Sequence, residues 1–218
     1  MPAFRKSYRV IRFDNRGVGK SDKPNGPYSI KVMAEDALGL MDHLSISKAC
    51  IIGVSMGGMI AQELAINYPE RVSKLVLACT CACHSENSGK TPEYSKIIGL
   101  STTEFRKRLL LLAYRTLLGK FVLLSLMNAT TKRGWEIGFE GQKAAIDAHN
   151  SFNRLPLVKS RTLVIAGTRD KVLYPSSSDI IAQKVPNAKL LKIEGGSHGI
   201  SAESPRRFNK EVVSFLRS

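Results

Sequence analysis

Residues 49–58 read Ala49-Cys50-Ile51-Ile52-Gly53-Val54-Ser55-Met56-Gly57-Gly58. An apolar run typical of a buried strand leads into Ser55, and a helical pattern follows to Tyr68, where Pro69 ends it. In such a strand–turn–helix the backbone passes close to itself, so small residues flank a serine that is forced outward at the carboxyl end of the sheet. The free N–H groups of the following helix favour negative charge there. The stretch predicts a nucleophilic Ser55; the alternative is a glycine-rich turn with an inert serine.

Strand patterns alternate with helical patterns along the chain, which predicts an α/β fold with a mostly parallel sheet flanked by helices. The expected strands are Tyr8–Phe13, Ala49–Val54, Leu75–Cys79, Thr162–Ala166 and Lys189–Ile193. The expected helices are Ile30–Leu44 after an N-cap at Ser29, Met56–Tyr68, Ser177–Val185 and Pro205–Leu216 after a cap at Ser204.

About eighty residues without strand periodicity separate the third and fourth expected strands. Ser101 to Glu104 has the form of a capping box before a leucine-rich helix, and a second helical pattern covers Ala144 to Phe152. We therefore expect an α/β core in residues 1–81 and 159–218, with a helical insertion at 82–158. The leucines of the insertion predict an apolar acyl pocket, and its basic residues favour a carboxylate-bearing substrate. A membrane-docking amphipathic helix is the alternative for residues 101–127.

The chain has 218 residues and a net charge of +15, which is high for this size. Such a surface can attract nucleic acid, anionic lipid or an acidic substrate. No zinc-finger spacing or aromatic RNA-binding signature accompanies the charge, so we expect a solvated basic surface and no nucleic-acid partner. A second interpretation is that compensating acidic sequence is missing from this chain. Hydrophobic residues make up 43%, an ordinary globular content that excludes a disordered chain.

Four cysteines occur, and three of them cluster in Cys79-Thr80-Cys81-Ala82-Cys83-His84. Structural zinc sites usually space their ligands by at least two residues, and no second ligand pair appears, so we expect no metal. We expect Cys79 in the core and the others at the junction with the insertion. The cysteines do not resemble a disulfide framework, and no signal peptide is recognisable, so a cytoplasmic location is the default. The apolar stretch Leu109–Met127 is interrupted by charged residues, so no stable membrane insertion is expected.

A serine hydroxyl needs a base within hydrogen-bond reach, and the base needs an acid that fixes its tautomer. His198 lies in Gly195-Gly196-Ser197-His198-Gly199, a flexible loop directly after the last expected strand. Asp170 follows the fourth expected strand in Gly167-Thr168-Arg169-Asp170. Both positions lie at the carboxyl edge of the sheet, where open parallel sheets bind their ligands. The order Ser55, Asp170, His198 therefore predicts a catalytic triad. The other histidines have surface or insertion positions: His43, His84 and His149.

With these motifs the chain resembles the α/β-hydrolase family, most of all its esterase, lactonase and C–C hydrolase branch with a helical cap. The resemblance spans nearly the whole chain. It includes the turn Phe13-Asp14-Asn15-Arg16-Gly17-Val18-Gly19-Lys20-Ser21-Asp22, the nucleophile elbow at Gly53–Gly58, and the acid and base loops. Dehalogenases and epoxide hydrolases of this fold carry aspartate at the elbow, so Ser55 argues against those two chemistries.

The family normally has three more strands and a helix upstream of Tyr8, and the third of these strands ends in a loop that supplies one oxyanion N–H. That strand lies between those matching Tyr8–Phe13 and Ala49–Val54. We therefore hypothesise that Tyr8–Phe13 pairs directly with Ala49–Val54 and that the backbone of Asp14–Gly17 approaches the oxyanion site. The alternatives are a fragment or a misplaced initiation codon. Loss of one oxyanion donor costs about 2.7–4 kcal/mol, so weak activity is consistent with a complete triad. Exposed apolar sheet favours self-association, hence a homo-oligomer.

The sequence thus predicts a serine hydrolase that cleaves a small carboxylic ester or lactone through an acyl-enzyme, without a cofactor or metal. The Met56 N–H is the expected oxyanion donor, and the second donor is unassigned. The alternatives on the same triad are a C–C bond hydrolase, an acyltransferase or a perhydrolase. Outside these, the chain is a catalytically impaired fragment or a binding protein derived from a hydrolase.

Overall fold

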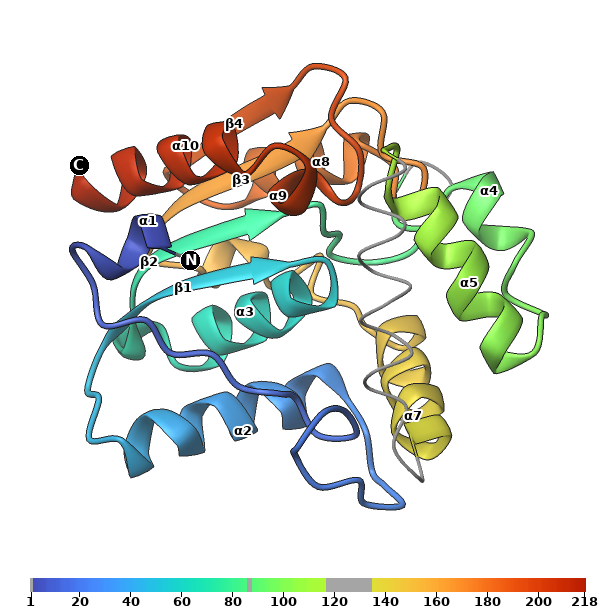
Figure 1. The fold of residues 1–218 in the computed structure, drawn as a ribbon. Coiled ribbons are helices and arrows are strands. Elements are labelled where there is room, and N and C mark those ends of the chain that lie inside the picture. The colour runs from blue at the N-terminus through green and yellow to red at the C-terminus, as the bar shows by residue number, and fades with distance from the viewer. Residues whose placement is uncertain (1, 86–87, 117–134) are drawn as a thin grey trace.

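A parallel sheet forms the centre of the molecule in the computed structural model, which describes residues 2–85, 88–116 and 135–218. Four strands pair in the order of the sequence: β1 Ala49–Val54, β2 Val72–Ala78, β3 Arg161–Gly167 and β4 Ala188–Ile193 (Figure 1). Each lies within a few residues of its expected range. The predicted fold class, a mostly parallel sheet flanked by helices, is confirmed.

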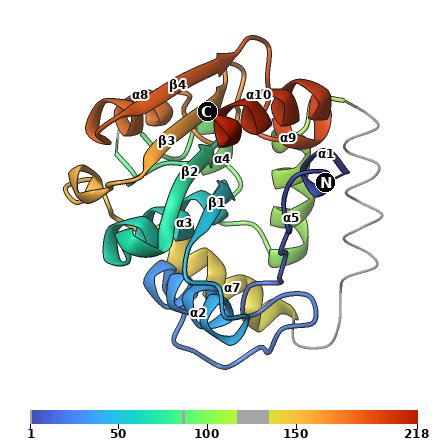
Figure 2. The same ribbon diagram turned by 90° about the vertical axis from the view of Figure 1, so that its left-hand side faces the viewer.

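Helices cover both faces of the sheet. Figure 2 shows α3 and α8 on one side of the strands and α1, α9 and α10 on the other, with α2 packed outside α3. The helices of this core are α1 Pro2–Arg5, α2 Ile30–His43, α3 Met56–Asn67, α8 Ser176–Lys184, α9 Ile200–Glu203 and α10 Pro205–Arg217, with 3-10 turns η1 Pro69–Arg71 and η2 Leu155–Leu157. Ser29 caps α2 as expected, because its hydroxyl accepts from the Val32 N–H.

Successive side chains along each strand point to opposite faces of the sheet, so the core has two layers. Leu75 and Leu77 of β2 face the cluster beneath α2, α3 and α8, while Val76 and Ala78 face the cluster beneath α10. All four side chains are fully buried, as expected for a central strand of a parallel sheet. This two-sided burial fixes the register and brings the carboxyl ends of the strands together at one edge.

The hypothesis that Tyr8–Phe13 pairs with β1 is wrong. The segment has no strand structure and no place in the four-stranded sheet, so β1 is an edge strand within the described residues. Tyr8 and Val10 instead pack against the same apolar cluster as Cys50 and Val54. Apolar contact through Tyr8 and Val10 holds the segment here, while Ile11 and Phe13 are exposed, so the β-branched run that predicted a strand does not form one.

An insertion between β2 and β3 contributes α4 Pro92–Ser95, α5 Thr102–Ala113 and α7 Trp135–Asp147, which lie beyond the carboxyl ends of the strands (Figure 1). Two local predictions fail there. Ser101 lies at the N-cap of α5 but makes no side-chain cap, and Glu104 pairs with Arg108, so no capping box forms. The helix expected at Ala144–Phe152 ends at Asp147 and begins earlier, at Trp135.

The stretch Leu109–Met127 is described only as far as residue 116, and the rest of that prediction lies outside the described residues. Among the helices that are described, none combines the length and the apolar character that a membrane span needs.

Side chains of helix α3 form hydrogen bonds with the chain at both ends of the insertion. The Gln62 amide donates to the Cys81 carbonyl at 3.1 Å, and its oxygen accepts from the Ser151 hydroxyl at 2.7 Å. Next to it, the buried Glu63 carboxylate forms a two-pronged ion pair with Arg154, at 2.8 and 2.5 Å. A buried carboxylate requires such partners. Burial alone raises the pKa of Glu63, but the Arg154 bonds outweigh it and leave the pKa below its ordinary value.

His149 lies against this ion pair with its side chain 2% exposed, and its Nδ1 is 3.6 Å from Glu63 Oε1. Burial lowers the pKa of His149 to about 4, although the Glu63 charge opposes the shift. The unfolded chain therefore binds a proton near pH 6.5 that the folded chain excludes until about pH 4. Folding stability consequently falls as the pH decreases through this window.

We expect His149→Gln to reduce this acid sensitivity. Between pH 6.5 and 4 the wild type loses up to about 3 kcal/mol through His149, a loss that the variant avoids. The free energy of unfolding in urea, measured at several pH values, tests this. His43→Gln, at the exposed end of α2, is the control and follows the wild type. Parallel curves for wild type and His149→Gln contradict the assignment.

Candidate active site

Ser55 lies on a sharp turn between β1 and α3 and adopts a positive φ of 54°. An L-residue rarely takes this conformation, so the surrounding structure must enforce it. Enforcement comes from the close approach of α3, because a Cβ at Gly53 would lie 2.2 Å from the Gly57 carbonyl oxygen. Only glycine fits at position 53, as the elbow motif predicts.

The end of β2 supports this turn. The Ser55 N–H donates to the Ala78 carbonyl at 2.9 Å, and the Thr80 hydroxyl donates to the Ser55 carbonyl at 2.8 Å. Gly58 packs directly against the Thr80 side chain. The backbone of Ser55 is therefore held on both sides, while its hydroxyl is directed away from the sheet.

The three predicted site residues meet at the carboxyl edge of the sheet. The Ser55 Oγ is 2.9 Å from the His198 Nε2, and the His198 Nδ1 is 2.7 Å from the Asp170 Oδ2. An ionised Asp170 accepts the proton of Nδ1, so Nε2 is left as the acceptor for the serine hydroxyl. The sequence order and the loop positions thus led to the correct spatial cluster.

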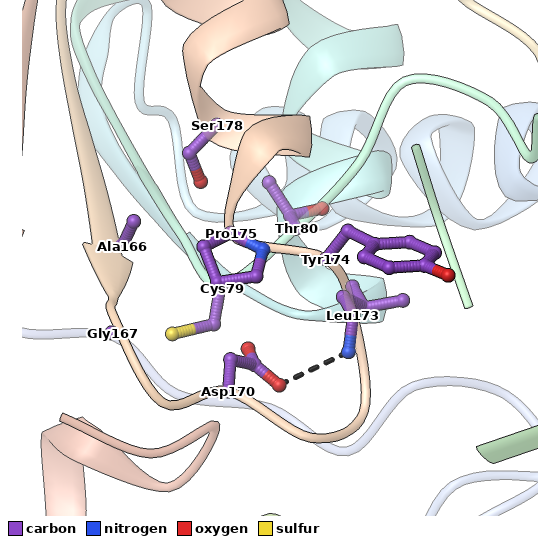
Figure 3. A pocket seen from close by; sticks show the side chains of 9 residues that line it. All are labelled: Cys79, Thr80, Ala166, Gly167, Asp170, Leu173, Tyr174, Pro175 and Ser178. Atoms are coloured by element: carbon purple, nitrogen blue, oxygen red, sulfur yellow. Dashed lines mark hydrogen bonds between the residues drawn. The ribbon is translucent and has the colours of Figure 1, made fainter. Parts of the chain in front are cut away.

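The carboxylate of Asp170 is oriented by its own loop. Its Oδ1 accepts the N–H groups of Val172 at 2.8 Å and Leu173 at 3.0 Å, which leaves Oδ2 for His198. The side chain is 3% exposed, and the hollow behind it is too narrow for a water molecule. Figure 3 shows Asp170 in this hollow, with the Leu173 N–H directed at it and Cys79 beside it. A dry, fixed carboxylate holds the imidazole strongly.

Cys79 is the one residue near the triad for which the sequence predicted only a core position. Cys79, Asp170 and His198 lie together, with their potential metal-ligating atoms within 4.8 Å of one another. In the described part of the chain, this is the one group of three or more such residues. Burial, followed by the Asp170 charge, raises the pKa of the Cys79 thiol far above its usual range. The protonated thiol donates to the Ser197 carbonyl.

The other residues of the cysteine cluster lie away from this group. Cys81 is buried, Cys83 is half-buried, and the His84 Nε2 is 3.2 Å from the Ile146 carbonyl of α7. The boundary between core and insertion that the sequence places here stays a prediction.

Met56 is the first residue of α3, so its N–H belongs to the group that a helix leaves without an intrahelical acceptor. The N–H groups of Gly58 and Met59 return to the Ser55 carbonyl. This position suits an oxyanion donor, and that role of the Met56 N–H stays a prediction.

The loop expected to approach the oxyanion site packs elsewhere. Arg16 pairs with Asp36 of α2 through two bonds of 2.6 Å, and the Arg16 carbonyl accepts from the Gln142 amide of α7 at 2.8 Å. Gly17 lies against Gly138 of the same helix. Loss of the expected strand pairing explains this, because nothing draws the loop toward the sheet edge.

Comparison with known proteins agrees with this geometry. The family profile described as alpha/beta hydrolase fold matches residues 1–140. The chain belongs to the α/β-hydrolase fold family. It is 28% identical to 3-oxoadipate enol-lactonase 2 of Acinetobacter baylyi, with 98% of this chain and 80% of that protein aligned. It is 31% identical to 2-hydroxymuconate semialdehyde hydrolase of Pseudomonas putida, over 98% of this chain and 79% of that enzyme.

Among solved structures, the enol-lactonase of Burkholderia xenovorans LB400 superimposes with a TM-score of 0.85 at 30% identity. The match covers 100% of this chain and 84% of the enol-lactonase. Membership of this hydrolase family supports an enzyme of the hydrolase class.

Two residues of this α/β-hydrolase site were missed as neighbours of the machinery. Thr80 supports the elbow, and Cys79 contacts the base loop, yet the sequence predicted only a core position for Cys79 and no role for Thr80. Their place directly after β2, the neighbour of β1, was the available signal, because adjacent parallel strands end side by side.

The elbow geometry predicts opposite effects for two nearby substitutions. Gly53→Ala places a methyl group against the backbone of α3 and costs about 1–3 kcal/mol or more. Gly57→Ala meets nothing within 4 Å in the first turn of α3, so it leaves stability unchanged or raises it by about 0.5–1 kcal/mol. Thermal unfolding of both variants measures the difference; equal melting temperatures would rule out the close approach.

Proposed function

We propose that this chain hydrolyses small carboxylic esters or lactones through an acyl-enzyme on Ser55. The observation that carries the proposal is the continuous chain of hydrogen bonds from Ser55 through His198 to Asp170, at 2.9 and 2.7 Å. A serine hydroxyl in such an arrangement loses its proton to the imidazole as it attacks a carbonyl carbon.

In the proposed mechanism, His198 Nε2 takes the Ser55 proton as Oγ bonds to the carbonyl carbon. The Met56 N–H stabilises the resulting oxyanion, and His198 returns the proton to the leaving alkoxide. Water then attacks the acyl-enzyme while His198 acts as base, and Ser55 leaves with the proton. Asp170 holds Nδ1–H throughout and stabilises the imidazolium. Every step uses groups of this chain.

Lactones are the first substrates to assay, because an enol-lactonase occurs both among the sequence relatives and among the similar solved structures. The net charge of +15 attracts anions, so we propose a carboxylate-bearing lactone as the preferred class. The helices α4, α5 and α7 would then form a cap over the reacting carbonyl. We propose residues 82–158 as this cap.

A C–C bond hydrolase is the second candidate, because 2-hydroxymuconate semialdehyde hydrolase is among the relatives. The same triad would serve a carbon leaving group, provided that a proton reaches that carbon. Assay of 2-hydroxymuconate semialdehyde beside the lactones separates the two candidates, and the substrate with the higher kcat/KM identifies the class.

The Ser55→Ala variant tests the nucleophile. We expect hydrolysis of p-nitrophenyl acetate and butyrate to fall by a factor on the order of 10⁴ or more, together with complete loss of labelling by a fluorophosphonate probe. Ser101→Ala is the matched control, since Ser101 is exposed and makes no cap. Labelling that persists in Ser55→Ala, or a folded wild type that neither labels nor turns over substrate, refutes the proposal.

A further inference from the structure

The loop that carries His198 is bonded to the end of α5 in the insertion. The Gly199 N–H donates to the Ala113 carbonyl at 2.7 Å, directly after His198. Before His198, the Arg115 guanidinium donates to the Gly195 carbonyl. The Tyr114 ring packs against Gly199, where even a methyl group would lie 2.5 Å from it. Residues 113–115 therefore contact the base loop on both sides of the imidazole.

One carboxylate joins these contacts. Glu203, at the end of α9, accepts the backbone N–H groups of Arg115 at 2.8 Å and Thr116 at 2.6 Å through Oε1. Its Oε2 accepts the hydroxyl of Ser197, the residue before His198. Ser197 is 1% exposed, and its Oγ also accepts the Gly199 N–H at 3.2 Å. Both sequence neighbours of His198 are thus restrained through Glu203.

The bonds to Glu203 favour its ionised form. Burial raises the pKa of this carboxyl, but the donors from Ser197, Thr116 and Arg115 outweigh burial and leave the pKa below its ordinary value. Hydrogen bonds to an ionised acceptor are about twice as strong as neutral ones. The carboxylate is therefore a strong connection between the insertion and the base loop at neutral pH.

We propose that Glu203 is a positioning residue for His198, which holds the imidazole between Ser55 and Asp170 by tying Ser197 to residues 113–116. The role in catalysis rests on the proposed function, whereas the role in placing His198 does not. A purely structural Glu203 would affect folding stability and leave the His198–Asp170 hydrogen bond of surviving folded molecules unchanged.

A spectroscopic signature separates these possibilities. The proton that Nδ1 of His198 shares with Asp170 at 2.7 Å is strongly deshielded and gives a far-downfield ¹H resonance. Loss of the resonance in Asp170→Asn assigns it. We expect Glu203→Ala to shift or broaden the resonance beyond detection and to slow fluorophosphonate labelling of Ser55 on the order of a hundredfold, as expected for misplacement by about 1 Å.

Glu203→Gln is the conservative variant. Its amide oxygen still accepts from Arg115 and Thr116, but the amide nitrogen cannot accept the Ser197 hydroxyl. We expect an intermediate shift and an intermediate labelling rate, which also decides the question if Glu203→Ala fails to fold. The control is Glu104→Gln on α5, where the carboxylate pairs with Arg108 on the surface; it keeps the resonance and the labelling rate of the wild type.

Wild-type resonance and labelling rate in either folded Glu203 variant overturn the proposal, as does a wild-type spectrum without a resonance that depends on Asp170. If the wild type shows the resonance but does not react with the probe, the serine-hydrolase proposal fails, and the NMR comparison still decides whether Glu203 positions His198.

Discussion

Helix α3 begins so close to the end of β1 that no side chain fits at Gly53, and the geometry of the site follows from this contact. The approach forces Ser55 into a positive φ, directs its hydroxyl away from the sheet, and places the start of the helix beside it. Because α3 is buried along most of its length, it cannot rotate to relieve the strain. The same helix supplies Gln62 and Glu63, which anchor both ends of the insertion. One helix therefore fixes the nucleophile and the attachment of the insertion.

The acid and the base are held by different means. Asp170 is oriented from within its own loop by two backbone N–H groups, in a hollow that excludes water. This loop is in turn bonded to the insertion, because Thr91 donates to the Lys171 and Val172 carbonyls. His198 lies on a loop with glycines on both sides, and such a loop has little intrinsic preference for one conformation. Its bonds to Asp170 and Ser55 orient the ring. The Gly195 carbonyl accepts from Arg115, while the Ser197 hydroxyl donates to Glu203 and the Gly199 N–H donates to the Ala113 carbonyl.

The sequence predicted the parts of the molecule that depend on local pattern. The strands from β1 to β4 and the residues Ser55, Asp170 and His198 follow from burial period and from positions after strands, and the structure brings these residues together. The strand predicted at Tyr8–Phe13 does not form, because a β-branched run favours an extended backbone without specifying a strand to pair with; only Tyr8 and Val10 pack on the core, and Ile11 and Phe13 are exposed. The capping box predicted at Ser101–Glu104 does not form, since the Ser101 hydroxyl makes no cap and the Glu104 carboxylate pairs with Arg108. The sequence did not indicate a role for Glu203, because its proposed role depends on contacts with residues almost ninety positions away.

The insertion and the loop that carries His198 are joined by several hydrogen bonds. A displacement of the α5 end would reach His198 through Gly199 and Ser197, and the Asp170 loop is bonded to the insertion at Thr91. The Ser55 turn, in contrast, is held by the end of β2 and the start of α3. The distance most sensitive to the insertion is therefore the one between Ser55 Oγ and His198 Nε2, across which the first proton moves in the proposed reaction. Catalytic groups must be held within a fraction of an ångström for efficient transfer. A substrate that packs against the insertion would consequently influence the rate of proton transfer as well as its own binding. Substrate selectivity and reaction rate would then both depend on the contact between the insertion and the base loop.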